Sequence, residues 1–313
     1  MPVTRQENAE YGEYVNQLAV EMGVFDLQNQ NEVWHYTDGN GFLGILQSGT
    51  MFATQVSALN DSKETQYGTD LFKDAVKATI AERADDQQAV TFLEIVLELV
   101  REEPTNPTQG ISKFFVTCFS SAKDDLNQWS IYQKASAGRY AIGFYPNGLN
   151  REPNSNLYRV IYDRAKQEES AKRVVEATLS FYRKGLTGER LNDPQQWARE
   201  FFPAWDDWIY KLAPLVKSVA WESEREYRIV HELKVAEFPR VRFAQKKTLL
   251  ARYLPLDFPC WVKERTSRLP IKSVMIGPGE NLASTRVSAV LLLEQMGYPG
   301  VSVEISTCTL MDR

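Results

Sequence analysis

The stretch Phe114-Phe115-Val116-Thr117-Cys118-Phe119-Ser120 is the clearest β-strand signal in the sequence. It is rich in aromatic and β-branched residues, and polar turn residues bound it, which is the pattern of a strand. The fold class therefore depends on how the other elements are arranged around this strand.

Strands and helices are interleaved irregularly on both sides of it. Further strands are predicted at 33–36, 51–54, 140–145, 158–162, 224–232, 240–243, 273–276 and 301–308. Helices are predicted at about 8–28, 42–46, 66–103 (with a break near Asp85-Asp86), 168–186, 194–219 and 284–296. Because strands adjoin one another instead of alternating regularly with helices, the order predicts an α+β fold with mixed or antiparallel sheets and flanking helices. We divide the chain into an N-terminal helical extension (1–31) and a single α+β domain (32–313) with helical insertions at about 66–103 and 168–219.

The composition predicts a folded protein of the cytoplasm. With 43% hydrophobic and 12% aromatic residues, the 313-residue chain can fill a substantial core. No apolar run approaches 18 residues and no apolar segment follows Met1, so neither a membrane span nor a secretory signal is expected. Cys118, Cys260 and Cys308 are odd in number and form no Cys-x-x-Cys pair, so we expect a reducing compartment, no disulfide scaffold and no metal site.

The net charge of −5 is unevenly distributed along the chain. Between Arg240 and Lys272, nine Lys and Arg stand against two acidic residues, which gives this segment +7 and leaves −12 for the rest. The basic segment 240–272 is a candidate for contact with nucleic acid or another acceptor. The alternative, an ordinary solvated face, is the more frequent case.

His35 is one of only two histidines and lies in Trp34-His35-Tyr36-Thr37, a short strand that Asp38-Gly39-Asn40-Gly41 ends. A titratable ring at a strand end is a candidate ribose ligand or base. Tyr36 and Thr37 add an aromatic face and a hydroxyl. The alternative is a core histidine at the end of a strand.

Glu224, Glu226 and Arg228 are spaced two apart, which on a strand directs all three side chains to one face. A fixed carboxylate pair favours chemistry that develops positive charge, as at an oxocarbenium-like sugar centre. The alternative is an exposed sheet face on which Glu226 and Arg228 pair with neighbouring strands.

A third cluster follows the strand at 114–120. Ser120 can bind polar groups of a ligand or cap the next turn. Trp129 and Tyr132 share one face of a short helix predicted at 126–133 and can stack on a flat ring, although such pairs more often cover the core. Cys118 is predicted to be a buried, inert thiol because its strand is so apolar.

Several groups of residues occur in a characteristic order along the chain. They are His35-Tyr36-Thr37, Leu59-Asn60-Asp61 with Glu64, Cys118-Phe119-Ser120 with Trp129 and Tyr132, Gly143-Phe144, and Trp221 with Glu224-Arg225-Glu226-Tyr227-Arg228. This order resembles the bacterial domain-of-unknown-function family 2971 over about residues 32–280. That family has no settled activity.

The layout also resembles, more distantly, the ADP-ribosyltransferase superfamily, which has a split-sheet core and a catalytic Glu on a late strand. This resemblance implies a transferase that consumes NAD and attaches ADP-ribose to a nucleic acid or protein, as a toxin or anti-phage defence effector does. Glu226 would bond the ribose 2′-hydroxyl and stabilise the oxocarbenium ion, and Glu224 would position or deprotonate the acceptor. One departure is that the middle motif is Cys-Phe-Ser instead of Ser-Thr-Ser.

The same resemblance implies a set of NAD-binding residues. His35 would hold a ribose, the backbone at Tyr36 would meet the carboxamide, and Trp129 or Tyr132 would stack on the nicotinamide. The complete predicted set is His35, Tyr36, Thr37, Ser120, Trp129, Tyr132 and Arg228.

Two other functions stay open from the sequence. One is a catalytically silent nucleotide- or partner-binding module, such as a sensor or an antitoxin-like component. The other is an NAD-independent nuclease that uses His35 with the carboxylates. The hypotheses that the protein is an enzyme require His35 and Glu226 to meet in one pocket, with a ribose-sized gap of about 5–10 Å between their side chains.

Overall fold

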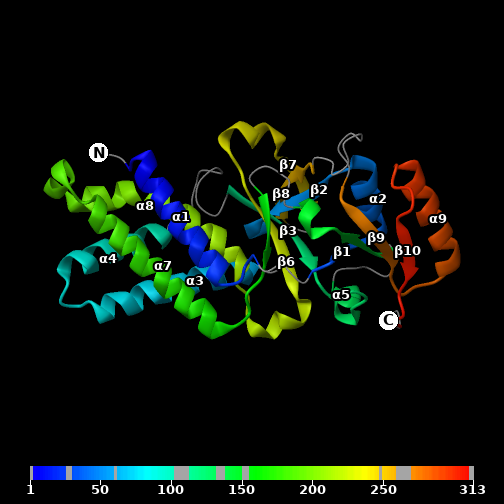
Figure 1. The fold of residues 1–313 in the computed structure, drawn as a ribbon, viewed down its shortest axis with the longest axis horizontal. Helices are drawn as coiled ribbons and strands as arrows, with labels where there is room; N and C mark the ends of the chain where they lie inside the picture. Colours follow the sequence, from blue (N-terminus) through cyan, green and yellow to red (C-terminus); the bar gives the residue numbers. More distant parts are fainter. Residues whose placement is uncertain are drawn as a thin grey trace.

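The computed structural model describes residues 3–25, 30–59, 62–101, 113–131, 138–149, 155–246, 249–258 and 269–309. An open sheet occupies the middle of the molecule, a helical lobe lies at one end, and α9 (Leu282–Gln295) lies at the other (Figure 1). The predicted α+β class, with helices flanking a mixed sheet, is thereby confirmed. Within the described ranges, no helix is both long enough and apolar enough to cross a membrane.

The sheet is organised around β3 (Phe114–Ser120). Its main path runs in the order β10-β9-β4-β1-β3-β2-β8-β7, while β6 and β5 leave this path at β3. Only the β9–β10 pair is parallel among these strands. The other strands are β1 (Val33–Asp38), β2 (Met51–Gln55), β4 (Arg139–Phe144), β5 (Ser155–Arg159), β6 (Glu226–Glu232), β7 (Arg242–Lys246), β8 (Leu249–Leu256), β9 (Ile271–Ile276) and β10 (Ser302–Ile305).

Two strands, β1 and β2, share one edge of β3. The opposite edge of β3 pairs along its whole length with β6, from Phe114↔Glu232 to Ser120↔Glu226. On the shared edge, β2 pairs with Phe115 and Val116, whereas β1 reaches only Ser120. β1 and β2 therefore diverge along β3, and the backbone polar groups between their contacts need other partners.

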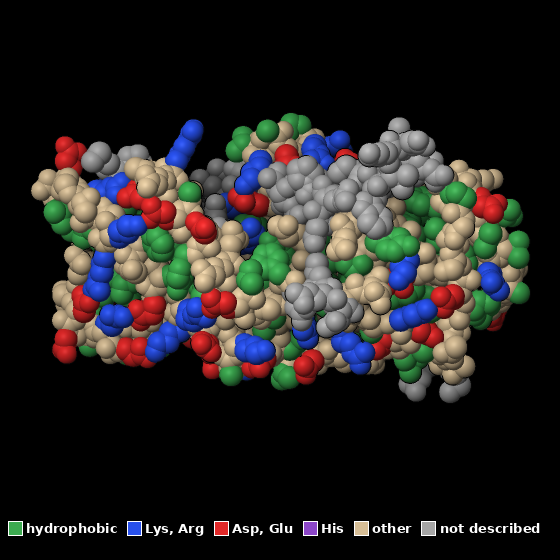
Figure 2. Space-filling view, viewed as in Figure 1, with side chains coloured by type: hydrophobic (Ala, Val, Ile, Leu, Met, Phe, Trp, Pro, Cys, Tyr) green, Lys and Arg blue, Asp and Glu red, His purple; other side chains and the backbone are tan. Residues whose placement is uncertain are grey.

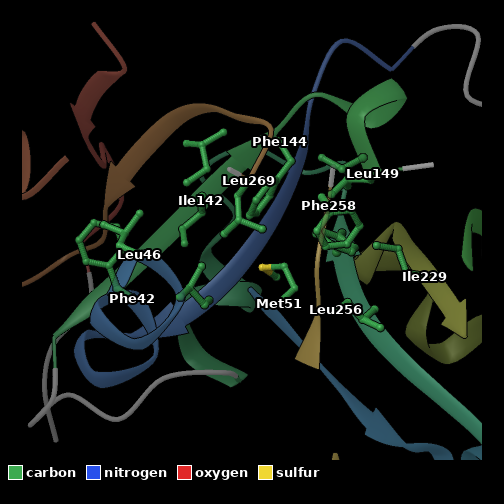
Figure 3. Packing of buried hydrophobic residues seen from close by; sticks show 14 of the residues in the cluster. Phe42, Leu46, Met51, Ile142, Phe144, Leu149, Ile229, Leu256, Phe258 and Leu269 are labelled. Atoms are coloured by element: carbon green, nitrogen blue, oxygen red, sulfur yellow. The ribbon is translucent and has the colours of Figure 1, made fainter. Parts of the chain in front are cut away.

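One face of the sheet packs on the largest hydrophobic core. Figure 3 shows side chains from α2 (Gly39–Ser48), β2, β4, β6 and β8 meeting there. Helix α2 was predicted to begin at Phe42 but begins at Gly39, because the Asp38 carboxylate caps it by accepting the Gly41 N–H at 2.8 Å. It ends at Gly49, whose φ of 66° is the left-handed conformation typical of a C-cap glycine.

The helical lobe has a core of its own. It is formed by α1 (Arg5–Glu21), α3 (Ser62–Glu82), α4 (Gln87–Arg101), α7 (Arg164–Gly185) and α8 (Pro194–Leu212). Phe92 of α4 stacks on Tyr182 of α7 at 4.0 Å, and Trp197 of α8 packs against Phe201. The helix predicted at 66–103 is therefore two helices, α3 and α4, and the break expected near Asp85-Asp86 is confirmed.

Glu224 was wrongly predicted to lie on the same strand as Glu226. β6 begins at Glu226, and Glu224 is the last residue of a short 3-10 helix, η6 (Val219–Glu224). Arg225 ends that helix in a left-handed conformation with φ 45°, and its N–H bonds the Glu222 carbonyl at 3.1 Å. This reversal breaks the strand alternation on which the prediction depended.

Other elements also differ from the prediction, and two of them show why: the end of one helix and strand β8. The helix expected to reach residue 219 ends at Leu212, because Ala213-Pro214 starts a 3-10 turn that an α-helix cannot continue through. Strand β8 was not predicted, and Pro255 within it argues locally against a strand. The proline is tolerated because β7 pairs only with residues 249–253, so that edge of β8 carries no strand partner at Pro255.

We expect the two helical glycines Gly68 and Gly44 to respond in opposite ways to substitution by alanine. A Cβ at Gly68 in α3 would lie 2.4 Å from the Ala213 carbonyl oxygen, so Gly68→Ala should lower the free energy of unfolding by about 1–3 kcal/mol. A Cβ at Gly44 in α2 meets nothing within 4 Å, so Gly44→Ala should raise it by about 0.5–1 kcal/mol. Urea unfolding measures both, and a stabilised Gly68→Ala protein would contradict the packing.

Candidate functional site

His35, Glu224 and Glu226 line the same small cleft, of about 60 Å³, although they are far apart in the sequence. They meet because β3 lies between β1, which carries His35, and β6, which begins at Glu226. The rest of the lining consists of Trp34, Tyr36, Cys118, Phe119, Ser120 and Gln128. The structure therefore brings together the imidazole and the two carboxylates that the sequence singled out.

The imidazole of His35 occupies the place where β1 diverges from β3. Its Nδ1 lies 2.9 Å from the carbonyl oxygen of Cys118, two residues before Ser120, with which β1 pairs. A carbonyl can only accept, so Nδ1 carries the proton and Nε2 has the lone pair when the ring is neutral. Burial lowers the pKa of His35, and the hydrogen bond to the carbonyl opposes this only in part. The ring is therefore neutral at pH 7.

Glu224 and Glu226 belong to a buried cluster of four charges. Arg228 clamps Glu226 through two hydrogen bonds, Nε to Oε1 at 2.8 Å and Nη2 to Oε2 at 2.7 Å. Lys217 Nζ lies 2.5 Å from Glu224 Oε2 and 3.3 Å from Glu226 Oε2. All four residues are at most 4% exposed. Two cations and two anions thus neutralise each other away from water.

The cluster keeps Glu226 ionised. Burial alone would raise the pKa of Glu226, but the charge and hydrogen bonds of Arg228, the charge of Lys217 and a hydrogen bond from Cys118 lower it to about 2. Arg228 also donates to the Pro214 carbonyl at 2.7 Å, which fixes its guanidinium. Arg228 therefore orients Glu226 but does not itself line the cleft.

Ser120 and Gln128 position the backbone at Glu224. Ser120 Oγ donates to the Glu224 carbonyl at 2.7 Å and accepts from the Ala122 N–H at 3.0 Å. Gln128 Nε2 donates to the same Glu224 carbonyl at 3.4 Å. The Ser120 hydroxyl, predicted to bind a ligand or cap a turn, is thus engaged with the protein itself.

The side chains of Tyr36 and Trp129 point into the protein interior. The Tyr36 hydroxyl donates to the Ala122 carbonyl at 2.7 Å and accepts from the Asp125 N–H at 3.2 Å, and burial raises its pKa. Its ring meets Trp129 edge-on at 4.7 Å. Trp129, in α5 (Leu126–Ile131), is fully buried, so its indole has no face toward the cleft.

Asp124 ties the loop after β3 to residues 306–308. Its carboxylate accepts from Trp129 Nε1 at 2.9 Å, from the Thr307 N–H at 2.8 Å and from the Ser306 hydroxyl. Burial would raise the pKa of Asp124, but these hydrogen bonds lower it to about 2. The Cys308 thiol adds a contact to the Asp124 carbonyl at 3.3 Å. The segment 306–308 therefore holds the loop that connects two residues of the cleft lining, Ser120 and Gln128.

The other predicted residues lie outside the cleft or outside the described ranges. Thr37 pairs with Tyr140 on β4 and does not line the cleft. Tyr132 and Cys260 fall outside the described residues. Among the residues that the structure does describe, no group of three His, Cys, Asp or Glu side chains is arranged to hold a metal ion.

A larger polar cavity of about 580 Å³ adjoins the cleft, and Glu226 lines both. Arg159, Tyr162 and Arg225 are in its lining, and no sequence pattern marked any of them as a site residue. Lys217 was likewise not predicted to belong to the site. A lone lysine between the apolar pairs Leu215-Val216 and Val219-Ala220 was the available signal that this charge is buried and paired.

The described part of the basic segment 240–272 is largely engaged with the protein. Arg240 pairs with Glu237 at 2.9 Å, Arg242 donates to the Pro239 carbonyl at 2.8 Å, and Lys272 donates to the Asn31 carbonyl at 3.1 Å. Residues 247–248 and 259–268 are outside the described ranges. Basic and acidic side chains are interspersed over the face shown in Figure 2.

Residues 128–229 match the family described as protein of unknown function (DUF2971). The predicted resemblance to this family is confirmed over that part of the chain, which is shorter than the expected 32–280. It includes Lys217, Glu224, Glu226 and Arg228 and ends before His231; His35 lies outside it. No curated protein and no solved structure matches the chain, so the resemblance to ADP-ribosyltransferases stays untested.

Removing the charge of Glu226 should destabilise the protein and flatten its acid response. Glu226→Gln leaves Arg228 and Lys217 buried with one counter-charge fewer, so the free energy of unfolding at pH 7 should fall by about 3 kcal/mol. The folded pKa is about 2 against 4.5 for the free side chain, so the stabilisation is complete above about pH 4.5 and is lost as the pH falls toward 2.

Urea unfolding at pH 7, 5, 4 and 3 measures both effects. The decline in stability below pH 5 should be smaller in Glu226→Gln than in the unmodified protein. Glu304→Gln is the matched control, because Glu304 makes an exposed ion pair with Lys123 whose loss should change stability by under about 1 kcal/mol. Equal stability of the Glu226→Gln and unmodified proteins at pH 7 would show that the cluster is not a buried charge network.

Proposed function

We propose that the protein is an ADP-ribosyltransferase-like enzyme that consumes NAD and transfers ADP-ribose to a nucleic acid or protein acceptor. The observation that carries this proposal is that His35 and Glu226 line one cleft from opposite sides of β3. Two groups that grip one sugar need this arrangement. The larger cavity beside Glu226 offers room for the rest of a dinucleotide.

The charge state of Glu226 supports the proposed chemistry. When the bond between the ribose C1′ and the nicotinamide nitrogen breaks, nicotinamide leaves with the electron pair and positive charge develops on the ribose. A carboxylate with a pKa of about 2 stays ionised at neutral pH and favours that charge. Because Arg228 already orients it, Glu226 needs little rearrangement during the reaction.

The remaining steps follow from the cleft lining. In this proposal the neutral His35 accepts a hydrogen bond from a ribose hydroxyl through Nε2. An oxygen or nitrogen of the acceptor then bonds to C1′, and its proton passes to the Glu224 carboxylate, which lies beside Lys217. These steps do not require Tyr36 or Trp129 to contact the ligand.

A second candidate function is a nucleotide-binding module without catalysis. The observation that favours it is that both oxygens of Glu226 already accept hydrogen bonds from Arg228 or Lys217 and that the side chain is buried. A buried carboxylate with both oxygens engaged in this way has a structural role, which a catalytically silent protein would also need. This candidate predicts that NAD raises the melting temperature without being consumed.

Nicotinamide release from NAD by the purified protein, followed chromatographically with and without nucleic-acid and protein acceptors, tests the enzyme. We expect Glu226→Gln to slow the release by about 100- to 1,000-fold, because it removes the charge that stabilises the transition state. His35→Asn keeps a donor for the Cys118 carbonyl but removes the ring, and should also slow it. Glu304→Gln should react like the unmodified protein.

The outcomes separate the two candidates. Binding of NAD without release under any acceptor condition supports the binding module and contradicts the enzyme. Release that persists at full rate in a folded Glu226→Gln protein would also contradict the enzyme as proposed. Neither binding nor release would contradict both candidates.

A further inference from the structure

The larger cavity next to the cleft has the size of a small-molecule site. Its volume of about 580 Å³ lies within the range of ligand pockets. Gln30, Ser121, Arg159, Tyr162, Glu222 and Arg225 line it, and it meets the smaller cleft at Glu226. Nearly all of the lining side chains named here are polar, so the cavity suits a polar ligand.

The balance of charge in the lining is positive. Arg159 and Arg225 are both exposed and stand against the single carboxylate of Glu222. Glu226 adds no net negative charge, because Arg228 and Lys217 neutralise it from below together with Glu224. Guanidinium groups bind phosphate oxygens through paired N–H donors, so an anionic, phosphate-bearing ligand fits this lining.

Arg225 is held in an unusual backbone conformation at the rim. Its φ of 45° and ψ of 50° are left-handed, a region that costs free energy for any residue with a Cβ and none for glycine. The Ser121 N–H bonds the Arg225 carbonyl at 3.0 Å and fixes this turn against the end of β3. With respect to the other described residues, its guanidinium makes neither a hydrogen bond nor an ion pair. An arginine at a position that favours glycine points to a use for its side chain.

We propose that the larger cavity binds the diphosphate of a nucleotide, with Arg159 and Arg225 contacting the phosphate oxygens. This inference rests on the proposed function, because it takes Glu226 as the point where the sugar lies and continues the ligand from there. Arg159 at the end of β5 and Arg225 just before β6 lie on adjacent strands, since Arg159 pairs with Tyr227. Two guanidinium groups from neighbouring strands match two linked phosphates better than they match a single phosphate.

Calorimetric titration and thermal unfolding of the full chain with ADP, inorganic pyrophosphate and adenosine test the site. ADP and pyrophosphate should bind and raise the melting temperature, and adenosine should bind far more weakly. Arg159→Gln and Arg225→Gly should each weaken ADP binding by about ten- to a hundredfold. Arg286→Gln is the control, because Arg286 is an exposed arginine on α9 outside the cavity, and its ADP affinity should match that of the unmodified protein.

Arg225→Gly separates binding from folding. Glycine relieves the left-handed strain, so the ligand-free variant should melt at the same temperature as the unmodified protein or higher while it loses ADP affinity. ADP affinity equal to that of the unmodified protein in Arg225→Gly, or adenosine binding as tight as ADP binding, would overturn the proposal. Failure of the unmodified protein to bind either ADP or pyrophosphate would overturn it as well.

The result is distinguishable from a failure of the proposed enzyme. ADP binding and nicotinamide release are measured on the same preparation of unmodified protein, so each proposal has its own readout. ADP binding that depends on Arg159 and Arg225, with no nicotinamide release by the unmodified protein, would refute the transferase and leave the diphosphate site in place.

Discussion

The mutual neutralisation of Lys217, Arg228, Glu224 and Glu226 is the constraint on which the site depends. Each of these groups loses nearly all contact with water, which costs several kcal/mol per ion unless the charges are paired in good geometry. The pairing meets this condition, because Arg228 grips both oxygens of Glu226 and Lys217 joins Glu226 to Glu224. The acids come from different local structures, a 3-10 helix and a strand, and the lysine fixes their relative position. The carboxylate wall of the cleft is rigid for this reason.

The same region is where the sheet is incomplete. β3 is paired along all of one edge, but on the other edge β1 and β2 diverge, because β1 pairs with Ser120 and β2 pairs with Phe115 and Val116. The imidazole of His35 lies at this place, and its hydrogen bond to the Cys118 carbonyl sets its tautomer. The cleft thus forms where the two strands diverge, and His35, whose ring hydrogen-bonds β3 at this place, also lines the cleft.

Local sequence patterns predicted the elements well and the directions of side chains poorly. The strand at 114–120 and the helix between Asp38 and Gly49 carry their own period and caps, so they could be identified without knowledge of their neighbours. Ser120 and Trp129 are inside because of contacts with Glu224 and Asp124, which lie elsewhere on the chain or across a tight turn. Lys217, Arg159 and Arg225 were missed for the same reason: a charge is part of a site only through its tertiary partners. β8 was missed because Pro255 is tolerated only at an unpaired stretch of edge.

The contact between Asp124 and residues 306–308 has a consequence for the order of folding. All residues that line the cleft precede this segment in the chain, so a ribosome makes all of them before it makes Ser306 and Thr307. The loop after β3 can pack on Tyr36 early, but its last restraint arrives only with β10 and the residues behind it. A nascent chain can therefore hold a nearly complete sheet while the cleft still lacks its final order, so the ordering of the cleft would lag behind compaction during biosynthesis.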